Sequence, residues 1–156
     1  MNAYRPVNER PSALTGAVIL IVEDDADLRH ILAAVLTRAG AEVLEADSAE
    51  KALDKLQRVV PDLVLTDVSL GGGRSGMWLL DEIRLSRAVP VVALTGRVEL
   101  GDLSPLGFAD AIFKPVEPKA LLARLTTVLE RRRRTRRRGP GRKRLPPGRG
   151  TRVSST

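Results

Sequence analysis

The 156-residue sequence contains no cysteine and a single histidine, His30, and only 3% of its residues are aromatic. Without cysteine the chain has no disulfides, no thiolate metal ligands and no cysteine nucleophile, which excludes a secreted disulfide-rich scaffold. The longest apolar run, residues 17–22, is far shorter than the roughly 20 residues that cross a bilayer. It also lacks the cleavage site of a signal peptide. We therefore expect a cytoplasmic protein with no membrane span.

Acidic residues are missing from the end of the chain, and this absence divides the sequence. All 19 acidic residues lie in residues 1–130 with 14 basic ones, which gives this part a net charge of −5. Residues 131–156 carry the other 12 basic residues, so the formal net charge of +7 for the whole chain describes neither part. We expect a flexible leader over residues 1–16, one domain over residues 17–130 and a basic tail over residues 131–156, disordered after about its first turn.

Short apolar runs alternate with stripes of helical period along the expected domain. Strands are predicted at residues 18–22, 42–46, 62–66, 91–94 and 109–113. Apolar residues recur at helical spacing between and after these runs, most clearly in residues 28–36 and 121–129. The helix expected at residues 100–107 contains Gly101 and Pro105, so we expect it to be irregular or shortened. The pattern predicts an α/β fold with a doubly wound, five-stranded parallel sheet, (βα)5.

Polar residues stand at the carboxyl ends of these strands, where ligands bind in open parallel sheets. Glu23 and Asp24 follow the first strand, Asp67 the third, Thr95 the fourth and Lys114 the fifth. Carboxylates that converge repel one another unless a cation lies among them, and oxygen ligands favour Mg²⁺. An ammonium and a hydroxyl opposite them suit the anionic oxygens of a phosphoryl group.

Four motifs resemble the receiver domains of two-component response regulators. They are VILIVEDD at residues 18–25, DLVLTD at 62–67, VVALTG at 91–96 and FKP at 113–115. The resemblance covers about residues 17–130 and implies the strand order 2-1-3-4-5. It also implies that Asp67 accepts a phosphoryl group, as a carboxylate nucleophile, from a histidine kinase or phosphotransfer protein.

The same resemblance assigns roles to the residues at the strand ends. Asp24 would hold Mg²⁺ directly and Glu23 through water, with Asp67 and the backbone carbonyl of Ser69 as further ligands. Thr95 would bond one phosphoryl oxygen and Lys114 would neutralise another. Such a protein is a phospho-switch with at most weak autophosphatase activity, not a metabolic enzyme, and it acts through protein–protein contacts. Asp25 is expected at the start of the first helix, and the Lys114–Pro115 bond is a candidate for the cis form.

The sequence departs from the family pattern in three places. Ala111 stands where the family usually has Tyr or Phe as a rotating switch. Thr95 and Lys114 are only 19 positions apart, which is shorter than usual by about one helical turn. The loop over residues 68–76, VSLGGGRSG, lacks the usual proline and gains about one residue. The family's usual output through its fourth and fifth helices is therefore not carried over.

The basic tail supports a different function. The arginines from Arg131 to Arg138 could contact nucleic acid or an acidic partner without sequence-specific readout, because the tail has no aromatic residue to stack on bases. The chain would then be a receiver-like binding module that is not phosphorylated. The tail could equally be a docking segment or a solvated extension. His30 lies off the apolar stripe of its helix, and we expect it at the surface.

Overall fold

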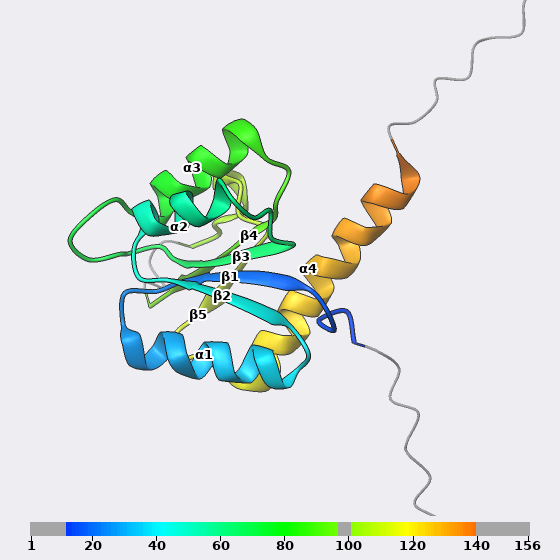
Figure 1. Ribbon diagram of the computed structural model, residues 1–156, viewed down its shortest axis with the longest axis horizontal. Helices are drawn as coiled ribbons and strands as arrows, with labels where there is room; N and C mark the ends of the chain where they lie inside the picture. The colour runs from blue at the N-terminus through cyan, green and yellow to red at the C-terminus, as the bar shows by residue number, and fades with distance from the viewer. Residues whose placement is uncertain (1–11, 97–100, 140–156) are drawn as a thin grey trace, which may run out of the picture.

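The computed structural model describes residues 12–96 and 101–139 (Figure 1). Within them lie five strands, four α-helices and a short 3₁₀ helix. In chain order they are β1 (Val18–Val22), α1 (Ala26–Arg38), β2 (Glu42–Ala46), α2 (Ala49–Leu56), β3 (Leu63–Asp67), α3 (Gly76–Ser86), β4 (Val91–Thr95), η2 (Ser104–Leu106), β5 (Asp110–Phe113) and α4 (Pro118–Arg138). The strands form one parallel sheet in the order β2-β1-β3-β4-β5, which confirms the predicted fold and strand order.

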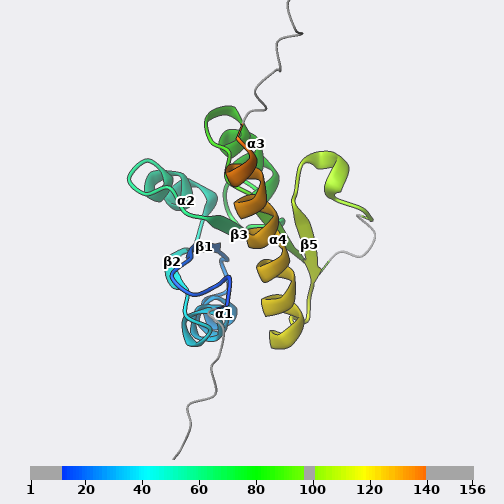
Figure 2. The same ribbon diagram turned by 90° about the vertical axis from the view of Figure 1, so that its right-hand side faces the viewer.

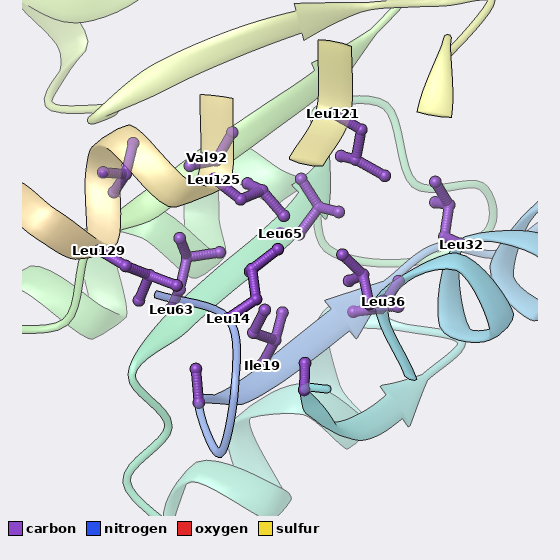
Figure 3. Packing of buried hydrophobic residues seen from close by; sticks show 14 of the residues in the cluster. Leu14, Ile19, Leu32, Leu36, Leu63, Leu65, Val92, Leu121, Leu125 and Leu129 are labelled. Carbon is purple, nitrogen blue, oxygen red and sulfur yellow. The ribbon is translucent and has the colours of Figure 1, made fainter. Parts of the chain in front are cut away.

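Two pairs of helices cover the two faces of the sheet. In Figures 1 and 2, α1 and α4 lie on one face and α2 and α3 on the other. Every residue of β3 and β4 is buried, which explains why these strands read as continuous apolar runs rather than as alternating patterns. Figure 3 shows Leu121 and Leu125 of α4 packed toward Leu65 and Val92 of the sheet.

Side-chain caps start the two helices that follow the site strands β1 and β3. Asp25 is the N-cap of α1, and its Oδ1 accepts hydrogen bonds from the backbone N–H groups of Asp27 and Leu28 at 3.0 and 3.2 Å. Ser75 caps α3 through a bond from the N–H of Trp78. The prediction that Asp25 lies at the start of the first helix is confirmed, and its carboxylate caps that helix.

The connection between β4 and β5 has no α-helix among its described residues. The 3₁₀ turn η2 lies there, and residues 97–100 fall outside the described part of the chain. Gly101 and Gly107 have positive φ angles of 63° and 107°, a backbone region that interrupts a helix, and Pro105 lies within the turn. The expectation of an irregular or shortened fourth helix is confirmed.

The packed part of the chain extends beyond both ends expected for the domain. Residues 12–16 are not wholly a flexible leader, because Leu14 is only 2% exposed and packs in the core near Ile19 and Leu63 (Figure 3). At the other end α4 continues for eight residues beyond Glu130, further than the single turn expected. Arginine favours helix, and Arg132 is held by the domain, as described below. The expected flexibility of residues 1–11 and disorder of 140–156 concern residues outside the described part.

Candidate functional site at the carboxyl ends of the strands

Three carboxylates meet at the carboxyl edge of the sheet. Glu23 and Asp24 directly follow β1, and Asp67 ends β3, its neighbour in the sheet. One carboxylate oxygen from each lies within 4.8 Å of the others. Glu23 and Asp67 are 1% and 6% exposed, whereas Asp24 is exposed. The structure therefore brings the predicted acidic residues together, with one of them open to solvent.

Lys114 bridges two of these carboxylates. It follows β5, and its Nζ lies 2.6 Å from Asp67 Oδ2 and 3.0 Å from Glu23 Oε2. Burial alone lowers the pKa of Lys114, but the hydrogen bonds to Asp67 and Glu23 outweigh burial and raise it above its ordinary value. The ammonium therefore stays charged at neutral pH and partly offsets the three carboxylates.

Backbone N–H groups hold further oxygens of the cluster. Asp67 Oδ1 accepts from the N–H of Ser69 at 2.8 Å, so donors hold both oxygens of this carboxylate. Asp24 Oδ2 accepts from the N–H of Gly71 at 2.9 Å. Sequence reasoning missed these donors because every residue but proline carries one, and only the chain path shows which N–H faces the site. The role predicted for the Ser69 carbonyl as a metal ligand stays a prediction.

The loop after β3 is packed closely onto the site. Gly76, the first residue of α3, is buried against the backbone of Asp67, and a Cβ at this position would overlap the Asp67 carbonyl oxygen. At Gly71, a Cβ would lie 2.8 Å from Asp24 Oδ2. Both glycines therefore allow the loop to approach the carboxylates.

Their surroundings shift the pKa values of the two acidic residues after β1 in opposite directions. Burial, together with the nearby charge of Asp67, raises the pKa of Glu23 from 4.5 to about 7, despite hydrogen bonds from Lys114 and the N–H of Asp25 that lower it. The hydrogen bond from the Gly71 N–H lowers the pKa of Asp24. Glu23 therefore exchanges a proton near neutral pH while Asp24 remains ionised.

Thr95 and Ala111 lie beside this cluster. Thr95 ends β4 and is 1% exposed, and its carbonyl oxygen accepts from the Lys114 N–H at 2.8 Å. Its predicted hydroxyl contact with a phosphoryl oxygen stays a prediction. Ala111 is half-buried, pairs with Ala93 in the β4–β5 register and packs against the core on the α2 and α3 face. The Lys114–Pro115 bond is cis, as expected.

Arg29 supports the site from α1 and was not predicted from the sequence. Its Nη1 donates to the carbonyl oxygen of Glu23 at 2.8 Å, and its Nε lies 3.3 Å from Glu45 Oε1 on β2. Arg29 thus ties the end of β1 to the sheet edge. The neighbouring His30 has a side chain that is 67% exposed, which confirms its expected surface position.

The donor set fits a hard divalent cation. Three carboxylates supply oxygen atoms close enough to share one ion, with Asp24 exposed and Glu23 and Asp67 buried. Their charge exceeds that of the Lys114 ammonium bonded to two of them, so the cluster keeps an excess of negative charge that a cation offsets.

Comparison with known families shows to which family this chain belongs. The model of the response regulator receiver domain matches residues 19–126, and the acidic cluster and Lys114 lie within that match. The chain belongs to this family. Receivers act in two-component systems as phospho-switches, interact with histidine kinases or phosphotransfer proteins, and bind Mg²⁺ at an acidic pocket.

The sequence of this receiver is similar to part of the sequence of longer regulators. It is 38% identical over 119 residues to the phosphate regulon transcriptional regulatory protein PhoB of Escherichia coli (strain K12), covering 72% of this chain and 52% of PhoB. It is 37% identical over 116 residues to the probable transcriptional regulator ycf27 of Porphyra purpurea, covering 72% of this chain and 47% of ycf27. The chain therefore spans about half the length of these curated relatives.

Solved structures show the same receiver fold. A putative response regulator from Chloroflexus aurantiacus matches with a TM-score of 0.66 and 34% identity, over 74% of this chain and 99% of that one. The chemotaxis response regulator CheY4 of Vibrio cholerae matches with a TM-score of 0.68 and 28% identity, over 73% and 99% of the two chains. Among the helices described for this receiver, none has the length and apolar character needed to cross a bilayer.

Proposed function

We propose that this receiver accepts a phosphoryl group on Asp67 from the phosphohistidine of a kinase or phosphotransfer protein. The observation that carries the proposal is the way the Asp67 carboxylate is held. The Ser69 N–H and the Lys114 ammonium bind its two oxygens, at 2.8 and 2.6 Å, beside two further carboxylates. This arrangement fixes the orientation of a nucleophile next to a place for a cation.

The transfer forms one bond and breaks another. An oxygen of Asp67 attacks the phosphorus, an O–P bond forms, and the P–N bond to the donor imidazole breaks. The imidazole leaves with the electron pair of that bond and takes up a proton. After the transfer, Lys114 donates a hydrogen bond to one oxygen of the phosphoryl group. The Thr95 hydroxyl donates a hydrogen bond to another.

Glu23, Asp24 and Asp67, with the carbonyl of Ser69, would hold Mg²⁺. The ion, when bound, offsets the negative charge that the carboxylates and the phosphoryl oxygens share. Glu23 must lose its proton to take part, and its pKa near 7 makes that loss easy at neutral pH. Asp24, whose pKa is lowered, is ionised and exposed before the ion arrives.

Phosphorylation changes the partners of Lys114, and this change is the signal we propose. The phosphoryl group adds charge and acceptor oxygens that compete with Glu23 and Asp67 for the ammonium. Lys114 lies between β5 and α4, so its movement reaches both elements. Ala111 has no ring that could rotate in response, and we propose output through altered protein–protein contacts. Self-dephosphorylation is at most weak.

Intact-mass measurement after treatment with acetyl phosphate and Mg²⁺ tests this proposal. The native chain should gain the mass of one phosphoryl group, and Asp67→Asn should gain none because its amide is not a nucleophile. Asp54→Asn, which alters an exposed carboxylate on α2, is the matched control and should be labelled like the native chain. Failure to label the native chain, or equal labelling of Asp67→Asn, contradicts the proposal.

A further inference from the structure

The last two turns of α4 form a surface that the phosphorylation proposal does not use. We call residues 131–138 the arginine extension. It contains seven arginines and Thr135, with no acidic residue, no lysine and no apolar residue. Figures 1 and 2 show α4 continuing beyond the sheet at this end. The extension contacts the segments that precede β1 and β3, so it lies at the opposite edge of the sheet from Asp67.

Two of the seven arginines hold the extension on the domain. Arg132 is partly buried, and its Nη1 donates to the carbonyl oxygens of Pro61 and Asp62 and lies 3.2 Å from Asp62 Oδ1. Arg133 Nη2 donates to the carbonyl oxygen of Ala13 at 2.9 Å. These bonds satisfy carbonyl groups in the segments that precede β3 and β1, so Arg132 and Arg133 have a structural role.

Three other arginines share one face of the helix. Arg131, Arg134 and Arg138 are exposed and, with Thr135 and Gly139, line a shallow hollow. They are spaced at i, i+3 and i+7, which places them on one side of the helix over about 10 Å of its axis. Like charges at these spacings repel, and the extension contains no acidic residue that could offset them. A polyanion would relieve that repulsion.

We propose that this face, Arg131, Arg134 and Arg138, binds the phosphate backbone of a double-stranded nucleic acid without strong sequence preference. Each of its cations is a guanidinium, whose fork of donors matches phosphate oxygens. A duplex carries one phosphate charge per about 1.7 Å of its axis, so the length of this face opposes about six charges. An α-helix with its side chains is about 10–12 Å across, which fits the major groove.

The composition of the extension distinguishes this partner from the other polyanions. A membrane-surface helix needs an apolar face, and the extension has none. Single-stranded nucleic acid is bound by stacking on aromatic side chains, which are also absent from it. An acidic peptide would have to become ordered along a rigid row of charges, whereas a duplex already presents its charges in a fixed array.

Fluorescence anisotropy of the full chain with a labelled mixed-sequence DNA duplex, from 50 to 200 mM NaCl, tests this inference. Arg131→Gln, Arg134→Gln and Arg138→Gln are combined in one variant. Three lost phosphate contacts should reduce the slope of log affinity against log salt by about 2.7. The native chain should therefore lose about 40-fold more affinity than this variant when NaCl rises from 50 to 200 mM. The matched control removes the same charge elsewhere on exposed side chains, by combining Arg38→Gln, Arg58→Gln and Lys119→Gln.

The result expected is tight, salt-dependent binding by the native chain, with the control close to native and the extension variant much weaker. Circular dichroism should show the same thermal midpoint for all three proteins. Equal weakening by both variants, no weakening by the extension variant, or no binding by the native chain overturns the inference. Competition by polyglutamate or by vesicles of anionic lipid at least as strong as by unlabelled duplex also overturns it. Asp67→Asn should bind like the native chain, so this test does not depend on phosphorylation.

Discussion

The raised pKa of Glu23 predicts that Mg²⁺ binding depends steeply on pH. Only the ionised carboxylate attracts the cation, and a proton bound to the carboxylate competes with the cation for it. Asp24 has a lowered pKa and Lys114 a raised one, so neither changes its charge between pH 6 and pH 8. With a pKa of about 7, Glu23 is ionised to about one part in eleven at pH 6 and to about nine tenths at pH 8. The affinity for Mg²⁺ should therefore rise about tenfold from pH 6 to pH 8.

Isothermal titration calorimetry at pH 6, 7 and 8 measures this dependence. Repeating the titration at pH 7 in buffers with different ionisation enthalpies should show release of about half a proton per Mg²⁺ bound. Glu23→Gln should bind Mg²⁺ more weakly and lose the pH dependence. His30→Gln changes an exposed side chain outside the acidic cluster, so it is the control and should keep the full dependence. A flat affinity in the native chain, or an unchanged slope in Glu23→Gln, would refute the reasoning.

Two stability predictions follow from the packing. Gly76→Ala should lower the free energy of unfolding by about 1–3 kcal/mol, because its Cβ meets the rigid backbone of Asp67, whereas Gly96→Ala, with open space around the new Cβ, should stay within about 0.5 kcal/mol of native. Urea unfolding compares them, and equal losses would contradict the overlap. Leu14→Ala should cost about 2–5 kcal/mol in the same assay if residues 12–16 are part of the core. A loss below about 0.5 kcal/mol would instead fit a detached leader.

The sheet could be predicted from the sequence because its signals are local. The apolar run of β3 indicates a strand covered on both faces, and the polar residues after each strand mark one edge once the strands are parallel. Glu23, Asp67 and Lys114 were placed together by this argument alone. The irregular structure among the described residues between β4 and β5 was anticipated in outline from Gly101 and Pro105.

Other features depend on contacts between distant parts of the chain. Leu14 is a single apolar residue with no periodic pattern around it. Only its packing between β1, β3 and α4 shows that it belongs to the core. The structural roles of Arg132 and Arg133 depend on carbonyl groups that are 70 and 120 positions away in sequence. Composition made the whole tail look uniform, whereas the structure divides its arginines into those that dock the helix and those that face solvent.

The single helix α4 gives the molecule a lever arm. It begins at Pro118, four residues after Lys114, and ends at Arg138 without an interruption over 21 residues. At 1.5 Å per residue the helix is about 30 Å long, so a tilt of about 5° about its first turn displaces its far end by about 2.6 Å. That displacement is comparable to a hydrogen-bond length. Arg132 and Arg133 bond the far part of the helix to the carbonyl oxygens of Asp62 and Ala13, so a shift of this size would break contacts at the opposite edge of the sheet from Asp67.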